Sequence, residues 1–154
     1  MNEQMLVDAV VKRIKKSLRI DLESSKKLIE LVEARCREKG LNAVICVCGP
    51  EGNVIAVHVM DGAFLVSFDV AMRKAYTAVG VKMPTIELAK LAQPGQTFYG
   101  VEGVDHGRVT IIGGGIPLTY RGRIIGGLGV SGGTSEQDHE IAEYGLSVLE
   151  QVME

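Results

Sequence analysis

One segment near the end of the chain, Gly113 to Asp138, restricts the possible folds more than any other. It contains two apolar runs on either side of an Arg121-Gly122 turn, a pattern that predicts a β-hairpin. The second run ends in a glycine-rich loop, and the polar residues that begin at Thr134 are typical of a helix start. The segment therefore predicts a hairpin that leads directly into a helix N-terminus.

The glycines of this loop predict that its backbone lies close to another group. Gly129, Gly132 and Gly133 surround Ser131. Glycine is otherwise a poor strand residue, because it loses much conformational entropy on folding and has no side chain to pack. The neighbouring group is either a ligand or packed backbone of the chain itself.

Composition narrows the class of protein. The chain has 154 residues, of which 46% are hydrophobic and 23% charged, values typical of a single globular domain. No apolar run approaches the ~18 residues that a membrane span needs. A net charge of -2 gives no reason to expect nucleic acid as a partner. No secretory apolar region follows Met1, so we expect a cytoplasmic location.

The three cysteines are expected to be reduced. Cys46 and Cys48 lie two residues apart in an apolar run and therefore on one face of a strand, and Cys36 lies in a helical pattern. A Cys-x-Cys metal site would need further ligands, and none stands nearby in the sequence. We therefore interpret all three as small buried side chains, with a metal or redox role as the alternative.

The rest of the chain pairs helices with helices and strands with strands. Strands that follow one another directly favour hairpins over alternating β-α-β units. We therefore predict an α+β fold in which helices flank an antiparallel sheet of four or five strands. Helical spacing covers residues 3–18, 21–40, 66–79, a short stretch after Pro84 and 135–153, and β-rich runs cover residues 43–48 and 54–60.

The first helix is predicted to be separate from the domain. Residues 1–20 are interpreted as an appended amphipathic segment, and residues 21–154 as the domain. Three roles for this helix stay open. It packs on its own domain or at an oligomer seam, it docks into the groove of a partner, or it lies on a membrane surface.

Four motifs resemble those of a known family. They are Met60-Asp61-Gly62-Ala63, Lys74-Ala75-Tyr76-Thr77-Ala78, GGGIPL and GGLGVSGGTSEQD, in that order. In sequence and spacing they resemble the GlcG/HbpS-like family of haem-binding or haem-degrading domains. This family also supplies the C-terminal domain of PduO-type cobalamin adenosyltransferases. The resemblance covers about residues 22–153.

The resemblance implies a profilin-like or PAS-like sandwich that assembles into dimers and up to octamers, and it implies haem as the ligand. Two features depart from the family pattern. Gly113-Gly114-Gly115 stands where relatives commonly have Pro-Gly-Gly, which makes the loop less rigid. Residues 1–20 are the second departure, and they resemble the short helices that direct enzymes into bacterial microcompartments. A shell protein is therefore an expected partner, and the interior of a microcompartment an expected location.

Haem iron needs an axial ligand, and the chain offers three histidines. His58 lies two residues from Met60 in a strand, so an imidazole and a thioether share one face. His106 lies near Glu102 and Asp105, a spacing compatible with metal binding or a general base. A half-exposed strand histidine and solvated loop charge are the respective alternatives. His139 near the start of the last helix is the weakest candidate, as a surface histidine.

The predicted helix start offers an anion site. Free amides and the positive end of the helix dipole favour a haem propionate or a phosphate, unless the chain caps these amides itself. Lys74 and Arg73 are candidates to pair with propionates, with surface salt bridges as the alternative. The predicted cofactor-binding set is His58, Met60, Lys74, Gly129, Ser131, Gly132, Gly133 and Thr134, and the predicted metal ligands are His58 and His106.

Several enzyme classes are excluded by their missing motifs. The chain has no nucleophile elbow with a Ser/His/Asp set, no Walker loop and no GxGxxG fingerprint. The leading hypothesis is an oligomeric cytoplasmic protein that binds haem or another tetrapyrrole and serves a microcompartment pathway. The alternatives are a haem-degrading or cofactor-processing enzyme assisted by His58 or His106, and an assembly subunit without a ligand.

Overall fold

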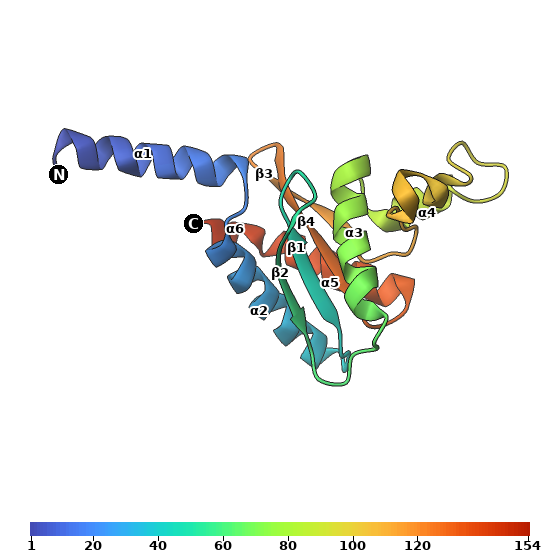
Figure 1. The fold of residues 1–154 in the computed structure, drawn as a ribbon. Helices are drawn as coiled ribbons and strands as arrows, with labels where there is room; N and C mark the ends of the chain where they lie inside the picture. The colour runs from blue at the N-terminus through green and yellow to red at the C-terminus, as the bar shows by residue number, and fades with distance from the viewer.

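A four-stranded antiparallel sheet forms the centre of the structure, a computed structural model that describes residues 1–154 (Figure 1). Its strand order is β2-β1-β4-β3, so two hairpins lie side by side. The predicted antiparallel α+β fold is confirmed, with four strands. The strands are β1 (Val44–Cys48), β2 (Val54–Val59), β3 (Gly115–Tyr120) and β4 (Arg123–Ser131).

Six α-helices complete the fold. They are α1 (Glu3–Leu18), α2 (Leu22–Glu38), α3 (Ser67–Val81), α4 (Thr85–Leu91), α5 (Ser135–Ser147) and α6 (Leu149–Met153). The helix expected over residues 135–153 is divided at Val148, whose ψ of 3° departs from the helical value. Two single 3₁₀ turns, Val101–Gly103 and Asp105–Gly107, lie in the long connection between α4 and β3.

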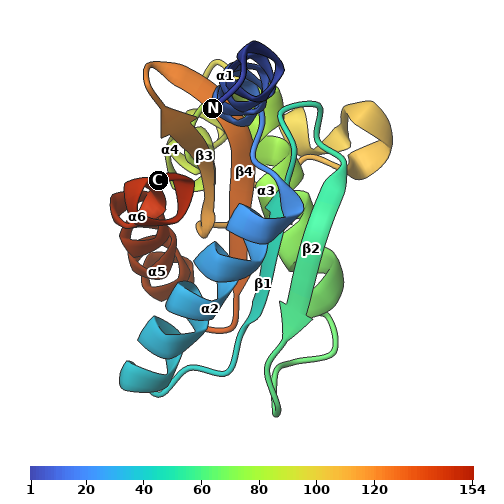
Figure 2. The same cartoon turned by 90° about the vertical axis from the view of Figure 1, so that its left-hand side faces the viewer.

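The sheet is covered on both faces (Figure 2). Helices α2, α5 and α6 lie on one face and α3 on the other. Strand β1 is buried throughout, because its odd residues Ile45 and Val47 join the larger core under α2, and its even residues join a smaller core under α3. The core therefore has two parts, with β1 between them.

The cysteines belong to these cores. All three are free and buried, Cys46 and Cys48 under α3 and Cys36 on α2. Burial raises the pKa of Cys46 and Cys48 to about 12 and that of Cys36 to about 11. Thiols with such pKa values stay protonated and unreactive near neutral pH.

The glycines of β4 allow α3 to lie close to the sheet. A Cβ atom on Gly129 would clash with the carbonyl oxygen of Ala71, and one on Gly127 would lie 2.6 Å from that of Ala75. The neighbour predicted for Gly129 is therefore packed backbone of α3.

Helix α1 projects from the body (Figure 1), and none of its residues is buried. The body itself begins slightly earlier than predicted. Ile20 is fully buried in the larger core, and its amide donates a hydrogen bond to the carbonyl of Ile125 at 2.9 Å. None of the helices has both the length and the apolar character required to cross a bilayer.

Candidate functional site

A groove of about 530 Å³ lies between the C-terminal half of α2 and strand β2. Its volume falls in the range of roughly 300–1,000 Å³ that is typical of small-molecule sites. Ligand contacts would come from one helix, one edge strand and the turn after that strand. The groove is lined by Glu33, Arg37, Asn42, Val57, His58, Val59, Met60 and Asp61.

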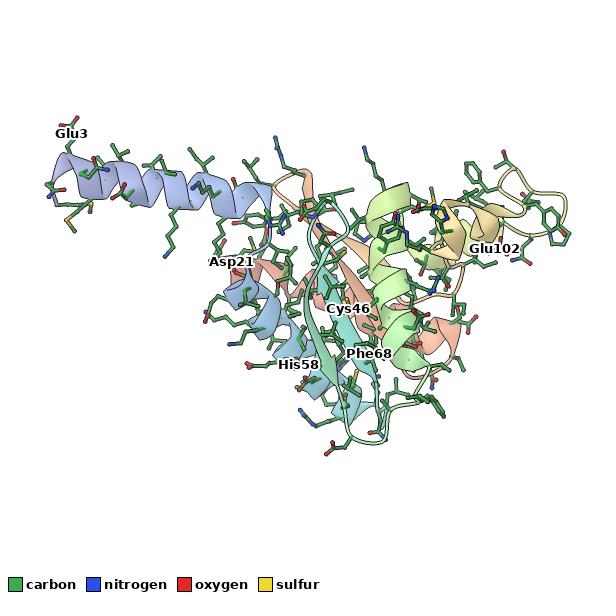
Figure 3. The ribbon with its side chains drawn as sticks, in the orientation of Figure 1. Glu3, Asp21, Cys46, His58, Phe68 and Glu102 are labelled. Carbon is green, nitrogen blue, oxygen red and sulfur yellow. The ribbon has the colours of Figure 1, made fainter.

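His58 is held in this groove by α2. It lies opposite Ile45 in the β1–β2 register and therefore on the α2 face of the sheet. In Figure 3 it is labelled beside β2, on the side toward α2. Its Nδ1 lies 2.5 Å from Oε1 of Glu33, and Glu33 also pairs with Arg37 at 3.3 Å. A carboxylate at Nδ1 favours the tautomer with the proton on that nitrogen. The Nε2 lone pair is then left free, and Nε2 has no hydrogen-bond partner in the chain.

This arrangement is the one that metal-ligating histidines commonly have. A carboxylate that accepts from one ring nitrogen fixes the ring and makes the other nitrogen a better ligand. The His58 side chain is 40% exposed, so a ligand can reach it. These residues therefore fit haem, whose iron takes an imidazole nitrogen as axial ligand.

Met60 lines the same groove as His58, as their spacing predicts. Its sulfur is 3.5 Å from the amide of Ala43 and accepts a hydrogen bond from it, and its side chain packs against the larger core. The thioether is therefore already engaged within the chain. His58 is the one histidine in the groove.

The glycine-rich loop does not offer the predicted anion site. The amides of Gly132 and Gly133 donate to the carboxylate of Asp138 at distances from 2.8 to 3.2 Å. Thr134 and Gln137 form a capping box, in which each side chain accepts from the backbone amide of the other residue. The chain caps these amides itself, which corrects the expectation of a propionate or phosphate at Gly132, Gly133 and Thr134.

Lys74 is likewise not available to a propionate. It is 1% exposed, and its Nζ donates to Oδ2 of Asp138 and to the carbonyl of Val130, both at 2.8 Å. Burial lowers the pKa of Lys74 below its ordinary value, and the adjacent carboxylate of Asp138 opposes this shift. Lys74 therefore joins α3, β4 and α5, and the expected ligand contact is corrected to a structural one. Nearby, the Ser131 and Ser67 hydroxyls are also hydrogen-bonded to each other, at 3.1 Å.

The cluster expected around His106 does not form. Asp105 pairs with the hydroxyl of Tyr76 and with Arg108, and no three donors of the kind a metal needs lie together anywhere in the chain. The cluster predicted from the spacing of Glu102, Asp105 and His106 is therefore absent, and His106 as a single haem ligand stays a prediction. His139 pairs through Nε2 with Glu143 at 3.0 Å, and its Nδ1 is buried without a partner.

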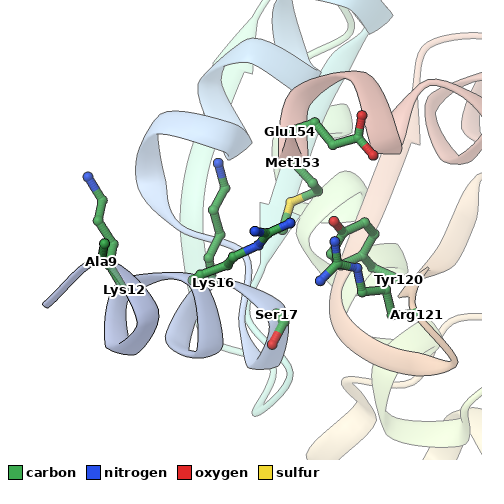
Figure 4. Close-up of a pocket in the computed structure, with 9 residues that line it drawn as sticks. Ala9, Lys12, Lys16, Ser17, Tyr120, Arg121, Met153 and Glu154 are labelled. Carbon is green, nitrogen blue, oxygen red and sulfur yellow. The ribbon is translucent and has the colours of Figure 1, made fainter. Parts of the chain in front are cut away.

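A second hollow, of about 570 Å³, lies in the angle between α1 and the body (Figure 4). From α1 it is lined by Lys12, Arg13 and Lys16, and from the body by Arg121 and Glu154. The charged face of α1 is thus turned toward its own domain. The apolar stripe of the helix is exposed, and it consists of Leu6, Val7, Val10, Val11, Ile14 and Leu18.

Comparison with known proteins gives the class. The model of the family described as "Haem degrading protein HbpS-like" matches residues 20–147, most of the domain that carries the His58 groove. The chain belongs to this HbpS-like family, which confirms the resemblance inferred from its motifs.

Particular relatives refine this assignment. The chain is 38% identical over 133 residues to a 15.0 kDa protein of the dhaT-dhaS intergenic region of Citrobacter freundii, covering 86% of this chain and 94% of the relative. It is 40% identical over 115 residues to the corrinoid adenosyltransferase PduO of the same organism, covering 75% of this chain but 34% of PduO. A crystal structure of a PduOC–haem complex superposes with a TM-score of 0.80 at 35% identity, covering 84% of this chain and 94% of that one.

Proposed function

We propose that this protein binds haem or a related tetrapyrrole as an oligomeric accessory protein, with Nε2 of His58 as the axial ligand. The observation that carries the proposal is the Nδ1–Glu33 contact of 2.5 Å, which leaves Nε2 free beside a groove of about 530 Å³. The PduOC–haem complex among the related structures supports haem as the ligand class. Asn42 and Arg37 are the donors in the groove that would meet propionates.

A hemin titration tests this proposal. We expect the wild-type chain to shift and sharpen the Soret band of hemin to saturation. His58→Ala should lose the histidine-ligated spectrum, because it removes the proposed axial nitrogen. His106→Ala is the matched control and should bind as the wild type does, because His106 lies outside the groove. An unchanged spectrum in His58→Ala would remove His58 as the ligand.

The contact between Glu33 and His58 also predicts a change in hemin affinity, which the same titration measures. Loss of such a carboxylate partner commonly lowers metal affinity by roughly 10–100-fold. We expect a weakening of this order in Glu33→Gln. Glu38→Gln, on the same helix but outside the groove, should leave the affinity unchanged. Equal affinities in the two variants would contradict the role of Glu33.

Haem degradation is the second candidate, because the family is described as haem-degrading. It predicts that the Soret band of the complex decays when a reductant is added in air. The decay should be faster than for free hemin and should stop in His58→Ala. A stable band supports binding alone, and the absence of any hemin shift would favour an assembly role.

For α1 we propose docking to a microcompartment shell protein. Six aliphatic side chains form an exposed stripe about 140° wide at the helical angle of about 100° per residue. The α1 side of the hollow next to the body is formed mainly by the charged residues Lys12, Arg13 and Lys16 instead. A helix packed on its own domain would bury its apolar stripe. This placement favours a partner that buries the stripe, in a microcompartment or at its cytoplasmic face.

Deletion of residues 1–18 tests this docking. We expect the shortened chain to keep the thermal midpoint of the full chain, because α1 buries no residue. It should no longer co-purify with the shell protein. Ile14→Asp, in the stripe, should act like the deletion, whereas Lys12→Ala on the opposite face should not. Co-purification that survives the deletion would contradict the docking role.

A further inference from the structure

The two edges of the sheet differ in how they are protected. Strands β2 and β3 are the edge strands. β3 contains Pro117, and five of its six residues are buried. The sequence of β2, VIAVHV, has no proline and no Lys, Arg, Asp or Glu, and its outer side is uncovered in Figure 2. Natural edge strands usually carry such charges or prolines to prevent pairing with other chains.

The outer side of β2 offers free backbone groups. The amide of Met60, just beyond the strand, donates to the carbonyl of Ala43 at 3.0 Å, so Met60 faces β1. Backbone groups in an antiparallel strand alternate in direction, so the amides and carbonyls of Val57 and Val59 face away from β1. These groups are ready to pair with a further strand.

An apolar projection and a partly apolar hollow lie near opposite ends of β2. The turn after its C-terminal end exposes Phe64, Leu65 and Val66, and Leu65 is 93% exposed. Near its N-terminal end lies a hollow of about 190 Å³. It is lined by Val54, by Met72 and Tyr76 from α3, and at its rim by the charged residues Asp69, Arg73 and Arg108. An exposed apolar cluster such as the turn at Phe64, Leu65 and Val66 usually marks a site of association.

A second copy of the same chain can pair with the free edge of β2, cover the exposed Leu65 turn and occupy the hollow near Val54. We propose that two copies pair antiparallel along β2 to form one eight-stranded sheet. The contact between the two β2 strands is called the β2 seam below. A two-fold axis at the strand centre places the Leu65 turn of each copy beside the Val54 end of the other. Such an interface is self-complementary, so every contact occurs twice. The inference rests on the proposed self-association and names its surface.

The pairing also bears on the His58 groove. Val57, His58 and Val59 of the pairing strand all line that groove. A two-fold axis perpendicular to the sheet keeps both His58 side chains on the same face. One groove therefore lies on each side of the seam, and the second copy supplies the wall that a single chain leaves open.

Light scattering during size-exclusion chromatography tests the seam without any ligand. Val57→Pro removes an outward amide, leaves the bonds to β1 in place and suits an edge strand. We expect it to halve the wild-type mass or reduce it further. Val57→Ala is the matched control, because it loses the same side-chain packing but keeps the amide, and it should retain the wild-type mass.

Leu65→Asp provides an independent variant that keeps the fold, because Leu65 is almost fully exposed and an acid is favourable near the start of α3. We expect it too to lower the mass, with an unchanged circular dichroism spectrum. An oligomer that persists in both Val57→Pro and Leu65→Asp overturns the β2 seam and leaves self-association intact. Equal dissociation of Val57→Ala and Val57→Pro overturns the strand pairing. A monomeric wild type overturns the seam and self-association together, whatever the hemin titration gives.

Discussion

At the scale of single residues, Gly129 sets how closely α3 approaches the sheet. A Cβ atom there would clash with the backbone of Ala71, which cannot move without shifting the helix. We expect Gly129→Ala to lower the free energy of unfolding by about 1–3 kcal/mol, as overpacking does. Gly80→Ala in α3 is the matched control, because no atom lies within 4 Å of its added Cβ. It should raise stability by up to ~1 kcal/mol through helix propensity. Urea denaturation measures both, and equal effects would contradict the packing argument.

Lys74 is the second residue whose role is structural. Lys74→Met would leave the carboxylate of Asp138 buried without its cation, which typically costs about 3–5 kcal/mol of unfolding free energy. Lys90→Met removes the exposed partner of Glu87 and should change stability by less than ~1 kcal/mol. Urea denaturation compares the two variants. A loss in Lys74→Met no larger than that in Lys90→Met would show that the buried pair contributes little.

At the scale of elements, Asp21 begins α2, the helix that carries Glu33. Its side chain accepts from the amide of Ser24 at 2.7 Å. We expect Asp21→Ala to lower the free energy of unfolding by about 1 kcal/mol, as the loss of an N-cap does. Asp21→Asn should stay near the wild type at neutral pH, because asparagine caps equally well. Similar losses in both variants would argue against capping.

The same cap predicts a dependence on acid pH. Burial alone would raise the pKa of Asp21. The hydrogen bonds from Ser24 and the charges of Lys16 and Lys12 outweigh it and hold the pKa below the usual 3.8. A depressed pKa means that the carboxylate stabilises the native state fully above pH 3.8 and loses this effect as the pH falls through the native pKa. The wild type should therefore become less stable than Asp21→Asn as the pH falls below 3.8, although the two are similar at neutral pH, and acid unfolding curves that stay together would contradict the assignment.

Periodicity was sufficient to predict most elements of the fold. The helices and hairpins lie where apolar spacing and turn residues place them, because each depends on neighbours in the chain. The boundary after residue 20 was less predictable. Ile20 belongs to the core through a hydrogen bond to Ile125, which is more than a hundred residues away. Local spacing carries no signal for such a contact.

At the scale of the whole molecule, the candidate site shows the same limit. Strand alternation places His58 and Met60 on one face, but the contact with Glu33 spans 25 residues and arises only when α2 packs on the sheet. The expected anion site was wrong because Asp138, in the first turns of α5, folds back onto the amides of Gly132 and Gly133. The acidic residues after the loop were the available signal for this internal cap.

The folded molecule also leaves two surfaces without a partner. They are the apolar stripe of α1 and the outer edge of β2 with the Leu65 turn. The first is proposed to contact a shell protein and the second another copy of the chain. Ile14→Asp alters only the first surface and Leu65→Asp only the second, so the two associations can be measured independently.

The most direct test of the central claim is chemical rescue of the axial ligand. The Soret spectrum of ferric hemin should be recorded with His58→Gly before and after imidazole is added, beside His106→Gly as the control. We predict that His58→Gly loses the histidine-ligated band, that imidazole restores it through the vacated position, and that His106→Gly matches the wild type throughout. A wild-type band in His58→Gly without imidazole would contradict the assignment of His58 as the haem ligand.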